Sequence, residues 1–155
     1  MGLTNNTKSV VSPRITVRNL QRKIPVNVAE LQKFALKVIP RCLQLRSRKR
    51  TDLTKLRSVS VWLISDRRMS RLHLQFLGES GTTDVLTFQH GEIFISAETA
   101  KRHARVFGNS LMRELQLYIL HGLLHLHGFD DRTQPGARRM EKMQAKILGD
   151  CSRDR

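Results

Sequence analysis

The chain has 155 residues, 39% of them apolar and 26% charged, which is the size and balance of one globular domain. No stretch reaches the roughly 18 apolar residues of a membrane span, and we expect no secretory signal, because the N-terminus lacks an apolar segment. The two cysteines form no CxxC pair, which argues against a disulfide framework and favours the reducing cytoplasm.

The formal net charge of +15 is concentrated in the first part of the chain. Residues 1–60 contain 14 Lys and Arg but only two acids, whereas residues 61–155 contain 14 basic and 11 acidic side chains. Such a balance favours a nucleic-acid partner over an anionic membrane, because the cations do not alternate with an apolar face. A solvated surface without a partner is the alternative. The densest basic run consists of Arg46, Arg48, Lys49 and Arg50.

The first predicted elements are a polar arm, a strand and a helix. Residues 1–12 lack periodicity and predict a flexible arm, followed by a single domain over residues 13–150. Residues 14–20 alternate apolar and polar side chains, as a half-buried strand does. Apolar residues then recur at helical spacing over residues 28–42, where Pro40 is expected to kink or shorten the helix.

A loop, a strand and a helix come next. Residues 46–57 show no apolar period and predict a basic loop. The clearest strand is 58–64, in which Trp62 is expected to pack in the core. Ser65 suits the start of a helix, which the glycines of 78–81 should end.

Two adjacent strands and three helices complete the pattern. Strand-like runs occupy 84–88 and 92–96, and helical periods follow over residues 97–107, 110–127 and 137–148. The order β-α-β-α-β-β-α-α-α indicates a small α+β domain, in which about five helices pack on a four-stranded mixed sheet.

The residues best suited to chemistry lie in HGLLHLHGFDD at 121–131. His121 and His125 are four residues apart, a spacing that places both imidazoles on one helix face, where they can bind the same metal ion. A glycine then ends the helix, and either Asp130 or Asp131 could return from the loop to the helix end. Two nitrogens and one carboxylate would leave a fourth position open for water, as in catalytic zinc sites.

Alternative interpretations accompany this metal site. A histidine pair in an apolar helix can also consist of hydrogen-bonded core residues. A zinc protease is disfavoured, because it needs Glu directly after the first histidine and Gly122 occupies that position. His127 lies about 200° around the helix from His125, so it should point away from the metal, and we expect it to face outward.

Two stretches together resemble one known family. HGLLHLHGFDD is similar to the signature HGxLHLxGxDH of the YbeY endoribonuclease family, and TDVLTF with GEIFIS, at 83–88 and 91–96, is similar to its TDVLSF and GDIxIS strands. The resemblance extends over most of the chain in the family's order of elements. It implies a single α+β domain that binds one zinc ion, cleaves single-stranded RNA, and acts in ribosomal RNA maturation and ribosome quality control.

Carried over residue by residue, the resemblance implies zinc ligands at His121, His125 and Asp131. The family has His at the third position, so a shorter, anionic side chain replaces a neutral one here. The family's Arg that serves the RNA phosphate corresponds to Leu77, which carries no charge. The cations on the preceding helix that could substitute for it are Arg67, Arg68 and Arg71.

These observations predict two functions from different classes. The first is a zinc-dependent, single-strand-specific endoribonuclease of ribosomal RNA processing and ribosome biogenesis, whose substrate is small-subunit ribosomal RNA held by the basic run at 46–50. The second is an RNA-binding ribosome-assembly factor that keeps the fold but has lost efficient cleavage, because Leu77 and Asp131 depart from the family pattern. Few aromatic residues are available for stacking on bases, so we expect little sequence readout.

Overall fold

The computed structural model describes residues 11–46 and 53–153. The elements in chain order are β1 (Arg14–Asn19), α1 (Val28–Gln44), the short 3-10 helix η1 (Leu53–Lys55), β2 (Ser58–Ile64), α2 (Asp66–Leu77), β3 (Val85–Phe88), β4 (Glu92–Ser96), α3 (Ala97–Phe107), α4 (Leu111–Leu126) and α5 (Gln134–Arg153). Residues 1–10, most of the expected arm, lie outside the described residues. No helix in the described part of the chain is long and apolar enough to cross a membrane.

The four strands form one mixed sheet in the order β1-β2-β4-β3. Neighbours β1, β2 and β4 are parallel, and β3 runs antiparallel to β4 at the sheet edge. Parallel neighbours need crossover connections, which α1 and α2 supply within the described chain, whereas β3 and β4 are joined by a tight turn. The predicted α+β class, with a four-stranded mixed sheet and five α-helices, is confirmed.

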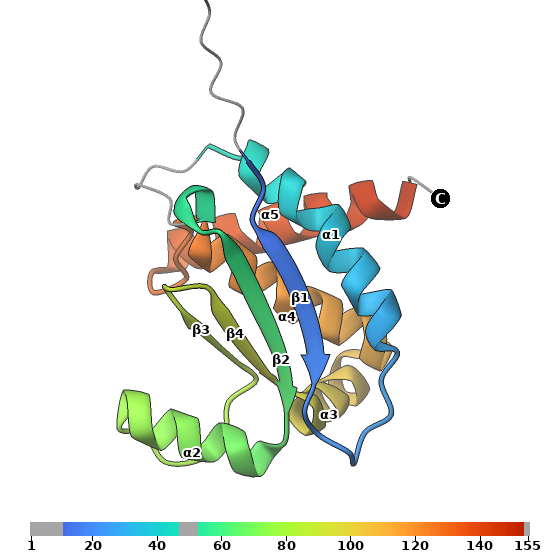
Figure 1. The fold of residues 1–155 in the computed structure, drawn as a ribbon, viewed down its shortest axis with the longest axis vertical. Helices are drawn as coiled ribbons and strands as arrows, with labels where there is room; N and C mark the ends of the chain where they lie inside the picture. The colour runs from blue at the N-terminus through green and yellow to red at the C-terminus, as the bar shows by residue number, and fades with distance from the viewer. Residues whose placement is uncertain (1–10, 47–52, 154–155) are drawn as a thin grey trace, which may run out of the picture.

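Strand alternation divides the apolar residues between two faces of the sheet. Val61 and Leu63 of β2 join the main core, which α1, α4 and α5 cover on one side of the sheet (Figure 1). Ile64 and the half-buried Trp62 pack on the other face, where Met69 of α2 closes a smaller cluster. Trp62 therefore has the packing role that its strand position predicts.

The structure differs from the sequence prediction in three places. Helix α1 continues past Pro40 to Gln44, because Pro40 lies on the exposed side of the helix. Pro40 has no N–H to donate to the backbone carbonyl of Leu36. Because Leu36 is exposed as well, water can hydrogen-bond to that carbonyl instead. The predicted basic loop contains η1, whose Leu53 is fully buried. Helix α5 is longer at both ends than the predicted 137–148.

Candidate metal centre

Helix α4 and the turn after it position the predicted ligands. The side chain of Ser110 accepts a hydrogen bond from the Arg113 backbone N–H at 3.1 Å and so caps the helix N-terminus. At the other end, Gly128 adopts a φ of 90°, and the Phe129 N–H donates to the Leu124 carbonyl at 3.0 Å. This turn reverses the chain and returns Asp131 to the last turns of α4.

Three donor atoms converge at this helix end. His121 Nε2 lies 3.1 Å from His125 Nε2, and the two nitrogens lie 3.5 Å from Oδ2 and Oδ1 of Asp131, respectively. Ligand atoms about 2.0–2.1 Å from a tetrahedral zinc ion would be about 3.3 Å from one another. Each histidine lies near a different oxygen of Asp131, and ligand atoms taken one from each side chain all lie within 4.8 Å of one another, so the three residues could hold one metal ion.

The electrostatics of the cluster also suit a cation. Burial, followed by the charge of His125, lowers the pKa of His121, while Asp131 and Asp84 act in the opposite direction. A lowered pKa keeps the imidazole neutral, which is the form that binds metal. Nε2 of each histidine and the carboxylate of Asp131 meet at one point, where a cation would be shared by three electron-pair donors.

Gln144 of α5 contacts the side of the His121 ring that is opposite the ligand cluster. Its Nε2 lies 3.2 Å from His121 Nδ1, the ring nitrogen that faces away from the ligand cluster. If Nε2 of His121 binds the metal, Nδ1 carries the proton, and the same amide turned by 180° presents its oxygen as the acceptor. The contact fixes the ring plane, and no motif indicates it because 23 residues separate the pair.

Gly122 explains why a protease-type glutamate is absent. A Cβ atom at this position would lie 2.8 Å from Cδ1 of Ile93, which is fully buried in β4. Helix α4 therefore approaches β4 so closely that a side chain at the residue after His121 would force Ile93 to shift, which disfavours a glutamate there. The same approach places the histidine pair beside the sheet edge.

His127 points away from the candidate ligands, as its helical position predicts, but it does not face outward. Its side chain is buried, and its Nε2 lies 2.8 Å from the carbonyl oxygen of Leu45 at the end of α1. The ring also stacks on Phe129 at a centroid distance of 6.2 Å. The expected outward orientation is wrong because α1 covers the far side of the α4 C-terminus.

The predicted RNA-binding residues are only partly described. Arg46 is exposed and follows Leu45, so the basic run begins next to the end of α4. Arg48, Lys49 and Arg50 lie outside the described residues. Leu77 ends α2 with 56% of its surface exposed. Three arginines of α2 could replace the phosphate contact of the family motif: Arg67, Arg68 and Arg71. None of them lines the cavity that lies beside His121, described next.

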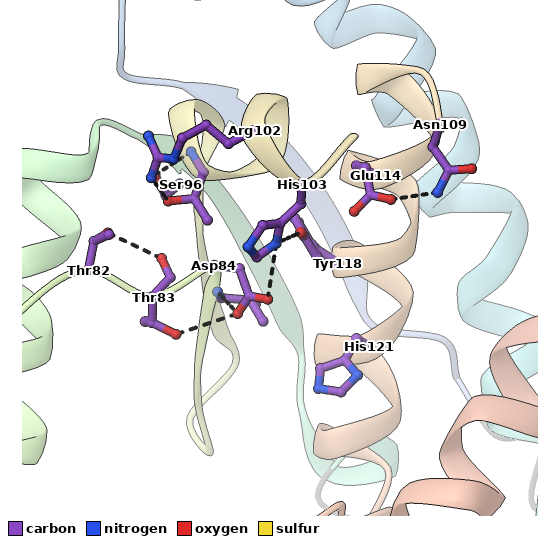
Figure 2. A network of polar contacts seen from close by, with 12 residues as sticks. Thr82, Thr83, Asp84, Ser96, Arg102, His103, Asn109, Glu114, Tyr118 and His121 are labelled. Atoms are coloured by element: carbon purple, nitrogen blue, oxygen red, sulfur yellow. Dashed lines mark hydrogen bonds and ion pairs between the residues drawn. The ribbon is translucent and has the colours of Figure 1, made fainter. Parts of the chain in front are cut away.

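A cavity of about 520 Å³ lies beside the metal centre and shares His121 with it. Its lining consists of Asp84, Val85, His103, Phe107, Asn109, Glu114, Leu117, Tyr118, His121 and Gln144. Figure 2 shows the polar side chains of this region around the Tyr118 hydroxyl, which lies 2.6 Å from His103 Nδ1. The sequence did not reveal this cavity, because its lining comes from β3, α3, α4, α5 and the loops between them.

The family is decided by a match along the chain. A family model described as "Endoribonuclease YbeY" matches residues 16–152. The chain belongs to the YbeY family. This confirms the family that the 121–131 motif and the two strand motifs indicated.

Individual relatives agree with this membership. The chain is 34% identical over 113 residues to Endoribonuclease YbeY of Frankia alni, a match that covers 60% of this chain and 62% of the relative. It is 27% identical over 150 residues to Endoribonuclease YbeY of Thermodesulfovibrio yellowstonii, which covers 86% of this chain and 94% of the relative. The match to the Anaeromyxobacter relative spans about half of that protein, 52%.

A solved structure shares the fold. The solution structure of TM1509 from Thermotoga maritima superimposes with a TM-score of 0.59, covering 90% of this chain and 93% of that chain at 24% identity. The YbeY-type arrangement of helices on the mixed sheet is therefore present in this chain.

Proposed function

We propose that this YbeY-family chain is a zinc-dependent endoribonuclease that cleaves single-stranded RNA, with small-subunit ribosomal RNA as its substrate. In this proposal it acts in ribosome biogenesis in the cytoplasm. The observation that carries the proposal is the convergence of His121, His125 and Asp131 in a chain of this family. Relatives in the same family carry the name endoribonuclease.

The cluster leaves room for a substrate. The side chains of His121, His125 and Asp131 are 23%, 27% and 42% exposed, so the cluster is partly open to solvent. A zinc ion held by these residues supplies Lewis acidity toward a phosphate oxygen or a water molecule. The chain itself orients the ligands, through Gln144 on His121 and through the Gly128 turn that carries Asp131.

The charge of the chain supports RNA as the substrate. A net charge of +15 attracts the phosphate backbone without regard to sequence. Arg46 starts the densest basic run, and the contact between Leu45 and His127 brings this start to the metal-bearing end of α4.

One observation favours the second function, an RNA-binding assembly factor with weak cleavage. Leu77 is exposed and uncharged where the family motif carries Arg, and none of the α2 arginines lines the cavity beside His121. Without a cation at that point, a phosphate would be held less firmly near the metal, so cleavage would be reduced while the basic surface still bound RNA.

A cleavage assay on the full chain separates the two functions. The zinc-loaded protein, the same protein after chelation, and the His121→Ala variant are incubated with single-stranded RNA and with a duplex of the same sequence. We expect internal cleavage of the single strand by the zinc-loaded protein only. Binding of the single strand without cleavage under any metal condition would support the assembly factor and contradict the nuclease.

A further inference from the structure

The cavity beside His121 has walls suited to a flat, apolar ligand. Val85 and Leu117 contribute aliphatic surface, and three rings stand close to one another, with His103 5.9 Å from Phe107 and 6.3 Å from Tyr118 between centroids. Phe107 remains 65% exposed at the end of α3, although it belongs to the lining. An exposed aromatic ring at a cavity provides a surface on which a planar group can stack.

The polar groups of the cavity hold one another in place and leave an acceptor atom available. Oδ1 of Asp84 accepts the Val85 backbone N–H at 2.8 Å, whereas Oδ2 lies 3.9 Å from His103 Nδ1, too far for a hydrogen bond. Glu114 lines the same cavity with only 2% of its surface exposed, and its Oε1 accepts from Asn109 at 2.7 Å. Figure 2 shows this network.

The charge of the lining excludes a phosphate as the ligand. Asp84 and Glu114 contribute two carboxylates, and no Lys or Arg is present among the lining residues, although the chain as a whole carries +15. Burial, followed by the charges of the two carboxylates, raises the pKa of Tyr118 far above its ordinary range. Its hydroxyl therefore remains protonated and can form hydrogen bonds. The cavity thus combines stacking surface with acceptors for N–H groups.

We propose that this cavity is a nucleobase pocket, which takes the base adjacent to the scissile phosphate and prefers a base with an exocyclic amino group to uracil. This inference rests on the proposed function, because an RNA held at the metal centre places a neighbouring base beside His121. The base stacks on Phe107 and His103, and its amino group donates to Oδ2 of Asp84.

The preference follows from hydrogen-bond chemistry. Cytosine and uracil have nearly the same size and differ on one edge: at C4 cytosine carries an amino donor and uracil a carbonyl acceptor, and at N3 cytosine is an acceptor and uracil an N–H donor. A carbonyl oxygen facing the Asp84 carboxylate pairs two acceptors and is repelled. Cytidine and uridine are therefore matched probes for the acceptor that the pocket presents.

The test is a nuclear magnetic resonance titration of the full-length, isotope-labelled protein, in its metal state as purified, with cytidine and with uridine. These nucleosides contain no phosphate to cleave, so the measurement is independent of nuclease activity. We expect cytidine to shift the amide signals of Val85 and Leu117 and to bind about tenfold more tightly than uridine. Asp84→Asn should bring the two affinities to within about twofold of each other.

Two adjacent exposed residues provide the variant and its control. Phe107→Ser should weaken cytidine binding about fivefold or more, since it removes a stacking surface. Val106→Ser, at a neighbouring residue that is 76% exposed and absent from the lining, should leave binding unchanged. Equal cytidine binding by wild type and Phe107→Ser would overturn the pocket, and equal affinities for cytidine and uridine in wild type would overturn the preference. If nucleosides bind but RNA is not cleaved, only the proposed nuclease function fails.

Discussion

At the scale of single residues, Asp131 decides how well the proposed centre holds zinc. Its Oδ2 stands 3.5 Å from Nε2 of His121 and its Oδ1 stands 3.5 Å from Nε2 of His125, and the side chain is 42% exposed. Asp is shorter than the His of the family motif and carries a negative charge, which makes a bound metal a weaker Lewis acid. The residue can therefore be a ligand and still limit catalysis.

Substitution of Asp131 tests this role. Asp131→His should tighten zinc binding, because a neutral imidazole is a favourable zinc ligand. Asp131→Ala should weaken it by about a hundredfold or more, since a metal ligand contributes more than the 10- to 100-fold of a supporting residue. Competition with a chelator ranks the variants, and Asp130→Ala, which removes the acceptor for the Arg132 N–H, is the control with a smaller effect. Equal zinc affinity of wild type and Asp131→Ala would show that Asp131 is not a ligand.

Asp66 predicts a pH dependence of stability away from the metal centre. Burial opposes its ionisation, but hydrogen bonds from Arg102, Ser96 and Thr99 outweigh burial and lower its pKa from 3.8 to about 2. A lowered folded-state pKa stabilises the protein above the unfolded value, and that contribution is lost as the pH falls from about 5 toward 2. The carboxylate thus joins the start of α2 to α3 at neutral pH.

Asp66→Asn should lower the free energy of unfolding by about 1.5–3 kcal/mol at pH 7. The difference from wild type should shrink as the pH approaches 2, where the wild-type carboxyl also becomes neutral. Urea unfolding between pH 7 and pH 3 measures it. Asp150→Asn is the control, because Asp150 is 41% exposed and 4.0 Å from Arg41, which makes its effect small at every pH. A difference that stayed constant down to pH 3 would contradict the role of the Asp66 charge.

The sequence predicted which side chains form the candidate ligand cluster, but not their surroundings. His121 and His125 could be predicted because a helical repeat fixes their separation, and Asp131 follows directly after the helix. The lining of the cavity could not, because Asp84, His103 and Tyr118 meet only after β3 and α3 pack beside α4. The burial of His127 likewise depends on α1, which is 82 residues away at Leu45.

At the scale of elements, the approach of α4 to β4 sets the position of the centre. Gly122 permits this approach, since any side chain there would meet Ile93. The number and order of the strands and α-helices could be predicted from periodicity, because each of them has a buried face, whereas the short helix η1 was not predicted. The continuation of α1 past Pro40 could not be predicted. It depends on whether the side of the helix that carries Pro40 and the unpaired Leu36 carbonyl is exposed to water.

Gly122→Ala should lower the free energy of unfolding by about 1–3 kcal/mol, because a methyl group would overpack the contact with Ile93. Gly149→Ala in α5 is the matched control. A Cβ at Gly149 would meet no atom within 4 Å, and alanine in an exposed helix position is favoured over glycine by about 0.5–1 kcal/mol. Thermal unfolding compares the two variants. Stabilisation by Gly122→Ala would mean that the α4–β4 contact is loose.

At the scale of the whole molecule, the uneven charge predicts how the protein holds RNA. Residues 1–60 contain 14 cationic side chains and only two acidic ones. Binding to a phosphate backbone should therefore release counterions and depend steeply on the salt concentration. Replacing Arg46, Arg48, Lys49 and Arg50 with serine should weaken binding to every RNA alike. The slope of log K against log salt should fall by about 0.7 for each RNA phosphate that the variant no longer neutralises. A slope unchanged by the four substitutions would place the RNA elsewhere.

The measurement that tests the central claim most directly is the zinc content of the purified chain and of its single-residue variants, by mass spectrometry of the metal. The wild type and His127→Ala should each contain one zinc ion per chain, because His127 points toward α1 and not toward the ligand cluster. His121→Ala and His125→Ala should contain none, while their circular dichroism spectra show the same helix content. A wild type that takes up no zinc, or a His121→Ala variant that retains it in full, would contradict the account.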